Sequence, residues 1–238
     1  MRLNNGIEIT WLGQSTLRFD FDGQTALADA WVQSNPACPD KCKTLEKVDS
    51  LFITHGHGDH FADALDIIET HRPTVAAIVE IAQYLTGKGF DNILAMNKGG
   101  TVEVNGLKAT MTHAVHSSSI QEPDGTLLPG GEAAGFIFEF PNGYKVYNAG
   151  DTALFADMRL IGEIYKPDLA ILPIGDNFTM GPLEAAHALR LLNVKAAAPA
   201  HYGTFDVLTG TPEAWRAEAE RLGLKVQFVE WEPGDTLR

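Results

Sequence analysis

Cysteine is scarce in this sequence of 238 residues, which contains only Cys38 and Cys42. The two are the ends of the segment Cys-Pro-Asp-Lys-Cys at residues 38–42. Two cysteines exclude the disulfide-rich scaffolds that stabilise many small secreted domains. A zinc site built from two cysteine pairs is excluded as well, because there is no second pair. We therefore interpret the two residues as reduced thiols in a loop, as expected for a cytoplasmic protein.

Long apolar runs and clusters of basic residues are also missing. No segment approaches the roughly 20 apolar residues that span a bilayer, and residues 1–6 lack the apolar stretch typical of a secretory signal. This predicts a cytoplasmic protein without membrane association. The formal net charge is −13, and an acidic surface repels the phosphate backbone of nucleic acids. Nucleic acid is therefore disfavoured as a partner, and a small-molecule substrate is favoured.

The apolar residues are plentiful by contrast, at 45% of the chain. This fraction is normal for a globular protein and sufficient for a large core. Folds of the α/β class often reach this length without division. Because no linker-like stretch interrupts the chain, we predict one domain over residues 1–238.

Hydrophobic patterns and turn signals predict strands first, then alternating strands and helices, in each half of the chain. Strands are expected at 7–12, 16–21, 25–29, 51–54, 74–79, 92–96, 101–104, 107–112, 135–140, 144–148, 168–173, 196–200 and 226–231. Helices are expected at 61–71, between 79 and 92, and at 155–165, 182–192 and 213–222. Residues 34–44 and 118–132 are expected to be loops, and long loops often cover active sites. The order favours two mixed sheets that face each other, with helices on the outer faces.

The hexapeptide at residues 55–60, His-Gly-His-Gly-Asp-His, contains four side chains that can bind a metal. These four cannot share one face of a helix, because neighbours on a helix face are three or four positions apart. The hexapeptide follows an apolar strand, and its glycines allow a tight turn. We therefore expect a loop that directs imidazoles and a carboxylate at one metal ion or at two adjacent ions.

Three further candidates stand where other predicted strands end: His116, Asp151 and His201. Strand ends that meet at one edge of a sheet are where α/β proteins place ligands. We therefore expect these side chains to join the hexapeptide, although an aspartate at a strand end can instead cap a helix. His113 is expected to pack or hydrogen-bond behind the metal ligands.

This pattern closely resembles that of the metallo-β-lactamase-fold hydrolases over essentially the whole chain. The finer likeness is to a branch of small bacterial and archaeal metal-dependent hydrolases that is related to L-ascorbate-6-phosphate lactonase. The segments that carry it are the hexapeptide, Ile-Thr-Trp-Leu-Gly at 9–13, His-Ser-Ser-Ser at 116–119, Gly-Asp-Thr at 150–152, Met-Gly-Pro at 180–182 and His-Tyr-Gly-Thr-Phe at 201–205.

The resemblance implies an αββα sandwich with a dinuclear metal site at its edge. It also implies how the ligands divide: His55, His57 and His116 would hold the first metal, and Asp59, His60 and His201 the second, with Asp151 as a bridge. One departure is Gln14, where many relatives have a histidine after the glycine. We expect that Gln14 does not bind metal and that an accessory polar contact near the mouth of the site differs from that in the relatives.

The nitrogen and oxygen donors suit two divalent ions of Zn²⁺, with Mn²⁺ or Fe²⁺ as alternatives. Two such ions roughly 3.5–4 Å apart can activate a hydroxide at neutral pH. We predict a hydrolase whose activated hydroxide attacks an ester, lactone or phosphodiester bond of a small metabolite. Asp59 is predicted to be catalytic, orienting the hydroxide and passing a proton to the leaving group. Tyr202 is expected to pack beside His201, with donation to a developing oxyanion as the alternative.

Two other functions stay open. The first is a nuclease or phosphodiesterase acting on nucleic acid, which the acidic composition disfavours. The second is a metal-binding module that kept the fold without catalysis, which the complete set of candidate ligands disfavours. The sequence leaves the oligomeric state open, with a homo-oligomer as one alternative to a monomer.

Overall fold

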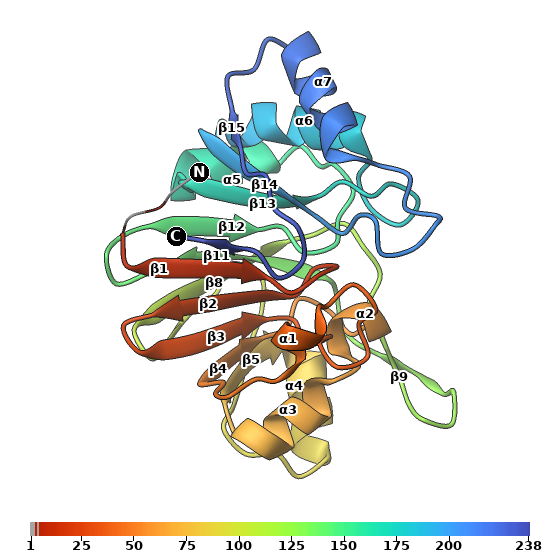
Figure 1. Cartoon of the computed structure of the whole chain (residues 1–238). Coiled ribbons are helices and arrows are strands. Elements are labelled where there is room, and N and C mark those ends of the chain that lie inside the picture. The colour runs from red at the N-terminus through yellow and green to blue at the C-terminus, as the bar shows by residue number, and fades with distance from the viewer. Residues whose placement is uncertain (1–2, 4) are drawn as a thin grey trace.

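Two seven-stranded mixed sheets lie face to face in the computed structural model, with helices on the outer faces of both (Figure 1). The structure describes residue 3 and residues 5–238. This arrangement confirms the predicted α/β sandwich. The expectation that residues 1–6 contain no secretory signal falls partly on residues 1, 2 and 4, which lie outside the described residues.

The first sheet combines an antiparallel half with a parallel half. Its strands are β16 (Thr236–Leu237), β1 (Ile7–Trp11), β2 (Leu17–Phe21), β3 (Gln24–Ala28), β4 (Ser50–Phe52), β5 (Thr74–Ile78) and β6 (Ile93–Met96), in that spatial order. A tight turn joins β2 to β3, and both of its central residues, Asp22 and Gly23, have positive φ, as a two-residue hairpin requires. The strands from β3 to β6 are parallel. Four helices accompany this half of the chain: α1 (Asp40–Lys43), α2 (Gly58–Phe61), α3 (Ala64–His71) and α4 (Val79–Gly87).

The second sheet repeats this plan. Its strands are β15 (Gln227–Phe228), β14 (Ala196–Ala200), β13 (Leu169–Pro173), β12 (Lys145–Asn148), β11 (Ala134–Glu139), β8 (Leu107–His113) and β7 (Thr101–Val104), in that order. Helices α5 (Met158–Tyr165), α6 (Pro182–Leu192) and α7 (Pro212–Arg221) pack outside it (Figure 1). Helices α6 and α7 each start with a proline. Proline has no backbone N–H, and it suits the first helical turn because an N–H at that position has no partner within the helix.

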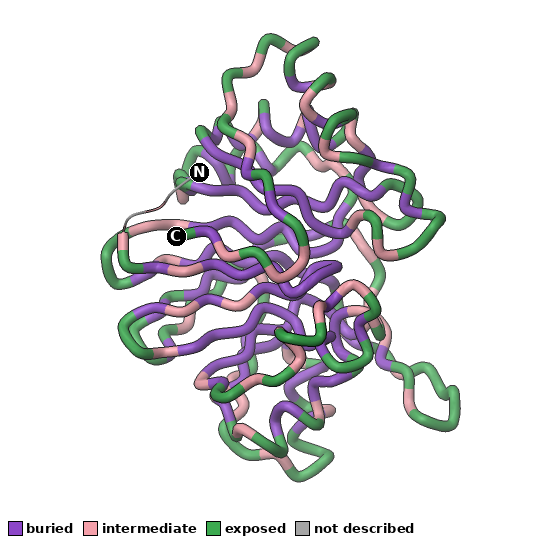
Figure 2. Tube along the Cα trace, in the orientation of Figure 1, coloured by how far each residue is buried: buried purple, intermediate pink, exposed green. Residues whose placement is uncertain are grey.

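The core between the sheets is built on aromatic side chains. Phe52 and Phe138 meet edge to face with their ring centroids 5.0 Å apart, and Phe19 packs against Phe138 at 5.1 Å. All three side chains are fully buried. Buried backbone follows the strands of both sheets, whereas the exposed segments lie mainly in the peripheral loops and outer helix surfaces (Figure 2). That residues 1–238 form a single domain stays a prediction.

Several predicted elements differ from the observed ones. The predicted helix at 61–71 starts later, as α3 at Ala64, because Phe61 ends the separate short helix α2, and the predicted loop at 34–44 contains α1. The strand predicted at 226–231 is only two residues long, at Gln227–Phe228, and β16 was not predicted. Strand β16 pairs with β1 from the other end of the chain, and such a long-range pairing leaves no local signal in two residues.

The predicted loop at 118–132 is in part a hairpin that projects from the body (Figure 1). Its strands are β9 (Ser119–Gln121) and β10 (Leu127–Pro129), paired antiparallel. The connection contains Pro-Asp-Gly, and Gly125 has a φ of +88°. This is ordinary turn chemistry, but the strands contain too few apolar residues to show a strand period. Among the described residues, no helix is both long and apolar enough to cross a membrane.

Both cysteines are free thiols, Cys38 buried and Cys42 half-buried. Burial raises the pKa of the Cys38 thiol to about 11, and the neighbouring Cys42 adds to this effect. The thiolate is the form that reacts with alkylating agents. Cys38 is therefore expected to react slowly near neutral pH.

This can be measured in a Cys42→Ser variant, where iodoacetamide can modify only Cys38. At pH 8 the folded protein should react up to about 100-fold more slowly than the same protein in denaturant, because a difference of two units in pKa gives that ratio of thiolate. Burial is the larger cause of the raised pKa and is kept in this variant. The rate in the folded protein should rise about tenfold for each pH unit up to pH 10. Equal rates in the folded and denatured states would contradict the prediction, with mass spectrometry as the measurement.

Candidate metal centre

All seven candidate ligands meet at one edge of the sandwich, on the segments that follow strands β4, β8, β12 and β14. They form two groups, and within each group the nitrogen or oxygen atoms lie within 4.8 Å of one another. The groups are His55, His57 and His116, and then Asp59, His60, Asp151 and His201. The structure therefore brings together side chains that are up to 146 positions apart. The two groups match the division that the resemblance implied except for Asp151, which was expected as a bridge and falls in the second group.

The hexapeptide is only partly a loop. His57 is extended, but helix α2 begins at Gly58, so Asp59 and His60 lie in a helical turn. The amides of His60 and Phe61 both donate to the carbonyl of His57 at 2.9 Å, which closes the turn. The expectation of a loop throughout was wrong at this point. The turn separates His57 from Asp59 and His60, so one short segment supplies both groups.

The two glycines of the hexapeptide play different parts. A Cβ atom on Gly56 would lie 2.8 Å from Cγ1 of Ile120 and 2.9 Å from the carbonyl oxygen of Ser119. Position 56 therefore has no room for a side chain, because the base of the β9–β10 hairpin packs directly on it. Gly58 has open space around it and no positive φ, so the expectation that both glycines are needed for the turn was wrong for Gly58.

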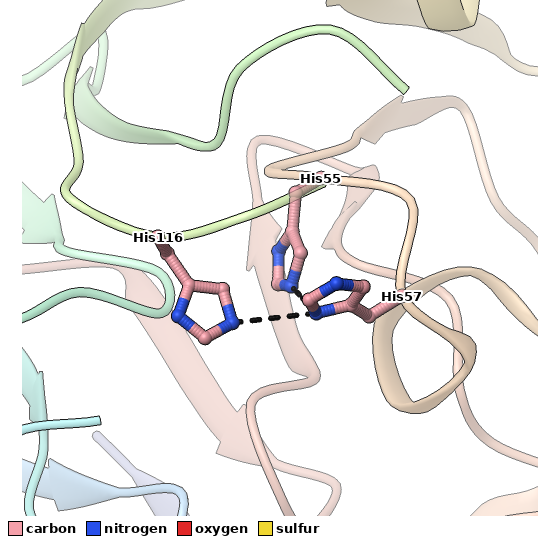
Figure 3. Close-up of side chains that lie close together, drawn as sticks. All are labelled: His55, His57 and His116. Carbon is pink, nitrogen blue, oxygen red and sulfur yellow. Dashed lines mark hydrogen bonds between the residues drawn. The ribbon is translucent and has the colours of Figure 1, made fainter. Parts of the chain in front are cut away.

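The first group consists of three imidazoles that face one another (Figure 3). Nε2 of His55 lies 3.0 Å from Nδ1 of His57, and Nε2 of His116 lies 3.3 Å from the same nitrogen. Burial lowers the pKa of all three side chains, and that of the fully buried His55 by the most. The rings are therefore neutral near pH 7, which is the form that binds a metal.

The second group is arranged around the carboxylate of Asp151. Oδ1 of Asp151 lies 3.2 Å from Nε2 of His60, and Oδ2 lies 3.0 Å from Nε2 of His201. Oδ2 is also 3.7 Å from Nε2 of His116, which belongs to the first group. Burial opposes ionisation of Asp151, but the two imidazoles of His201 and His60 outweigh it and hold the pKa well below its usual range. Asp59 completes the group, with Oδ2 3.4 Å from Nε2 of His201.

The sequence prediction missed Asp29, which orients the ligands from behind. Asp29 is fully buried, and its Oδ2 accepts a hydrogen bond of 2.7 Å from Nδ1 of His60. The hydroxyl of Thr54 donates to the same carboxylate at 2.9 Å and therefore accepts from Nδ1 of His55 at 3.0 Å. With both Nδ1 atoms protonated, the lone pairs on Nε2 are free for a metal. The available signal was an aspartate directly after the apolar strand at 25–28.

Two further residues, His113 and Tyr202, were expected to lie beside the candidate ligands. His113 is exposed, packs on the ring of Phe155 at 5.2 Å and lies 3.0 Å from Nζ of Lys98, so it does not support the ligands. Tyr202 stacks on Trp11 at 5.1 Å and its hydroxyl donates to the carbonyl of Trp231 at 3.3 Å. Tyr202 therefore packs as expected, and its hydroxyl is not directed at the metal ligands.

The donors fit divalent cations. The Nε2 atom of His60 is buried and has no hydrogen-bond partner among the described residues, and an unpaired buried nitrogen is costly unless something else binds it. It faces two carboxylates, those of Asp151 and Asp59. Nitrogen and carboxylate oxygen, without thiolate, is a ligand set that suits Zn²⁺, Mn²⁺ or Fe²⁺.

Comparison with known proteins agrees with this geometry. Residues 21–202 match the family model described as the β-lactamase superfamily domain. The chain is 49% identical to a UPF0173 metal-dependent hydrolase from Rubrobacter xylanophilus, with 98% of this chain and 96% of the relative covered. A relative of the same name from Methanopyrus kandleri is 45% identical, with 97% and 99% covered. Among solved structures, Igni18, a metallo hydrolase from Ignicoccus hospitalis, superimposes with a TM-score of 0.84 at 35% identity, with 97% of each chain covered.

Replacing Asp29 by asparagine should weaken metal binding. Asparagine keeps the shape and tolerates the φ of +63° at this position, but it removes the charge that holds the His60 ring. Loss of such a supporting carboxylate typically costs about 10–100-fold in metal affinity. The affinity for Zn²⁺ should be measured by competition with a chelator.

The matched control is Asp22→Asn, at an exposed turn position whose φ is +46°. It has the same change of charge in a similar backbone conformation and should leave the affinity unchanged. Equal affinities in the two variants would show that Asp29 does not support the metal ligands.

Metal binding should also strengthen with pH. Burial alone would lower the pKa of His201, but the Asp151 carboxylate outweighs it and raises the pKa to about 9. Below that pH a proton occupies the nitrogen that a cation needs, so the two compete. The apparent affinity for Zn²⁺ should rise about tenfold per pH unit between pH 7 and pH 9 for each proton displaced, and level off above. Calorimetry in buffers of different ionisation enthalpy should show proton release at pH 7, and an affinity independent of pH in this range would contradict the assignment.

Proposed function

The chain belongs to the UPF0173 metal-dependent hydrolases of the β-lactamase superfamily, and on that premise we propose that it cleaves an ester, lactone or phosphodiester bond of a small metabolite with two divalent cations bound side by side. The observation that carries this proposal is the position of Asp151. One oxygen of its carboxylate faces His60, and the other faces both His201 and His116. A single carboxylate thus borders both groups of candidate ligands, as a bridging ligand would.

The two groups would each hold one cation, most simply Zn²⁺, with Mn²⁺ or Fe²⁺ as alternatives. His55, His57 and His116 would hold the first, and Asp59, His60 and His201 the second, with Asp151 shared. When bound, the cations supply a water of strongly lowered pKa and polarise the oxygen of the bond to be cleaved.

Asp59 is the carboxylate best placed to move a proton. Its side chain is 25% exposed, whereas that of Asp151 is 2% exposed, so a substrate can reach only the former. Burial opposes ionisation of Asp59, but the His60 ring outweighs it and lowers the pKa of the carboxyl. Asp59 is therefore ionised at neutral pH, and we propose that it accepts a proton from the attacking water. It would then return that proton to the leaving group.

The surroundings of the site support a substrate with an apolar part. Phe205 follows His201 by four positions, is 41% exposed and lies with its ring 6.0 Å from that of Trp31. Phe178, 57% exposed, belongs to the loop whose residue Met180 donates to the carbonyl of Thr152, next to Asp151. We therefore propose that these exposed aromatic side chains, on segments that adjoin the candidate ligands, contact the apolar part of the substrate.

The two alternatives remain distinguishable. A nuclease would need a basic surface for the phosphate backbone, and the net charge of −13 disfavours it. A metal-binding module without catalysis would bind both cations but turn over no substrate. The free thiols of Cys38 and Cys42 support our proposal that the protein acts in the reducing cytoplasm.

The proposal is tested by metal analysis together with a substrate panel. The purified protein should bind two cations per chain and should hydrolyse p-nitrophenyl esters, lactones or bis(p-nitrophenyl) phosphate. A chelator should abolish the activity, and added Zn²⁺ or Mn²⁺ should restore it. A protein with both cations bound and no activity on any of the three classes would support the binding module instead.

Replacing Asp59 by asparagine tests its part in proton transfer. With metal supplied at saturation and the metal content measured, kcat should fall by about 10²–10⁴-fold, the usual contribution of a general acid or base. Asp66→Asn, on the exposed side of α3, makes the same chemical change away from the site and should leave kcat unchanged. Full turnover by the Asp59→Asn variant with both cations bound would rule out this role.

A further inference from the structure

We infer that the turn between β1 and β2, residues 13–15, positions the second group of candidate ligands, and that the Gln14 side chain is its positioning residue for Asp59. The inference rests on the proposed function, because it takes the second group to be a cation site. The sequence prediction expected only that an accessory polar contact near the mouth would differ because of Gln14. The structure places it at the centre of a set of contacts that reach three of the four members of that group.

The backbone of this turn adopts conformations that ordinary residues rarely take. Gly13 has a φ of +97° and Gln14 a φ of +50°. A Cβ atom at position 13 would lie 3.0 Å from Cβ of Ala37 and 3.2 Å from Nδ2 of Asn35, so this position requires glycine. The left-handed region is unusual for glutamine, and such residues persist where surrounding contacts hold them, often at functional sites.

The contacts of the turn are directed at the second group. Nε2 of Gln14 donates to Oδ2 of Asp59 at 2.8 Å, and the backbone carbonyl of Gln14 accepts from the amide of His201 at 2.8 Å. The hydroxyl of Ser15 donates to Oδ1 of Asp151 at 3.4 Å. The same Gln14 carbonyl also accepts from Nε1 of Trp11 at 3.0 Å, which anchors it to β1. Three ligands from three different strand ends are thus held by two consecutive residues.

His201 depends on this contact for its direction. It follows the last residue of β14 and has a φ of +53°, so the chain turns sharply at the residue that must present its ring. Its amide is fixed by the Gln14 carbonyl in a buried position. Two residues with positive φ, one from each sheet, are therefore joined by one hydrogen bond.

The chemistry of the Gln14 side chain suits this task. An ionised carboxylate only accepts hydrogen bonds, so the amide must turn its nitrogen toward Asp59. A neutral amide fixes the carboxylate without neutralising it, which leaves the negative charge available to a cation. Glutamate at this position would bring a like charge against Asp59, whereas histidine, the residue that the family resemblance led us to expect here, would still offer an N–H donor.

The side-chain oxygen of Gln14 supports a role beyond packing. Gln14 is fully buried, and its Oε1 has no hydrogen-bond partner among the described residues. A side chain that served only to fill space would be replaceable by an apolar one without this cost. The hydrogen bond from Nε2 to Asp59 offsets the cost of burying the unpaired Oε1.

The test is a titration of metal-free protein with Co²⁺, followed by visible absorption, which reports each binding step separately. Four variants are compared with the unmodified chain: Gln14→Ala, Gln14→Glu, Gln14→His and Ser15→Ala. Gln83→Ala, an exposed glutamine on α4, is the matched control. Thermal unfolding of each metal-free variant shows whether the fold is intact.

We expect Gln14→Ala to weaken one binding step by about 10–100-fold and to leave the other within threefold. Gln14→Glu should weaken the same step at least as much, Gln14→His should retain most of the affinity, and Gln83→Ala should match the unmodified chain. Ser15→Ala removes a single long hydrogen bond and should show a smaller effect on the same step.

Two outcomes would overturn the inference. One is that Gln14→Ala binds both ions as the unmodified chain does, and the other is that it weakens both steps equally. If Gln14→Ala does not fold, the Gln14→Glu and Ser15→Ala variants decide by the same criteria. A single binding step in the unmodified chain would instead refute the two-cation function, so the two failures are distinguishable.

Discussion

The carboxylate of Asp151 is the group on which the rest of the site depends. A buried charge is costly unless it is paired and hydrogen-bonded, and this one is 2% exposed. It is compensated by His60 and His201, which lie within 3.2 Å, and by the hydroxyl of Ser15. These partners come from segments that are far apart in the chain. The sandwich must therefore bring their strand ends together before the charge can be buried at all.

The ligands are held in place by a layer of residues behind them. Asp29 and Thr54 fix the rings of His60 and His55 through their Nδ1 atoms, and both supporting residues are fully buried. The turn at 13–15 supports the second group as well, through contacts with the carboxylates of Asp59 and Asp151 and the backbone amide of His201. Asp29 and Thr54 bind the ring nitrogens that point away from the site, so the Nε2 atoms stay free. Gln14 and Ser15 instead donate to carboxylate oxygens that face the site. Supporting contacts of this kind set ligand orientation in metalloproteins generally.

Much of the architecture could be predicted because local patterns encode it. Helix α6 and strand β14 were predicted at their observed bounds, and the hairpin turn at Asn105-Gly106 shows its own signal. The hairpin of β9 and β10 and the final strand β16 were missed, since two or three residues carry no period and their pairing is long-range. Asp29 was missed for a related reason: its role requires contact with His60, which stands 31 positions later.

The sequence by itself determined the chemical character of the candidate site: four side chains able to bind a metal in six residues, further histidine and aspartate at strand ends, and no thiolate among them. Residue type and spacing suffice for this, because the donor atoms of a side chain are a local property. Only the tertiary structure decided how the donors divide into two groups, and that Asp151 lies between them. It alone showed that Gln14 contacts Asp59, 45 positions away. Distances between side chains on different strands depend on how the two sheets pack, and no local pattern records that.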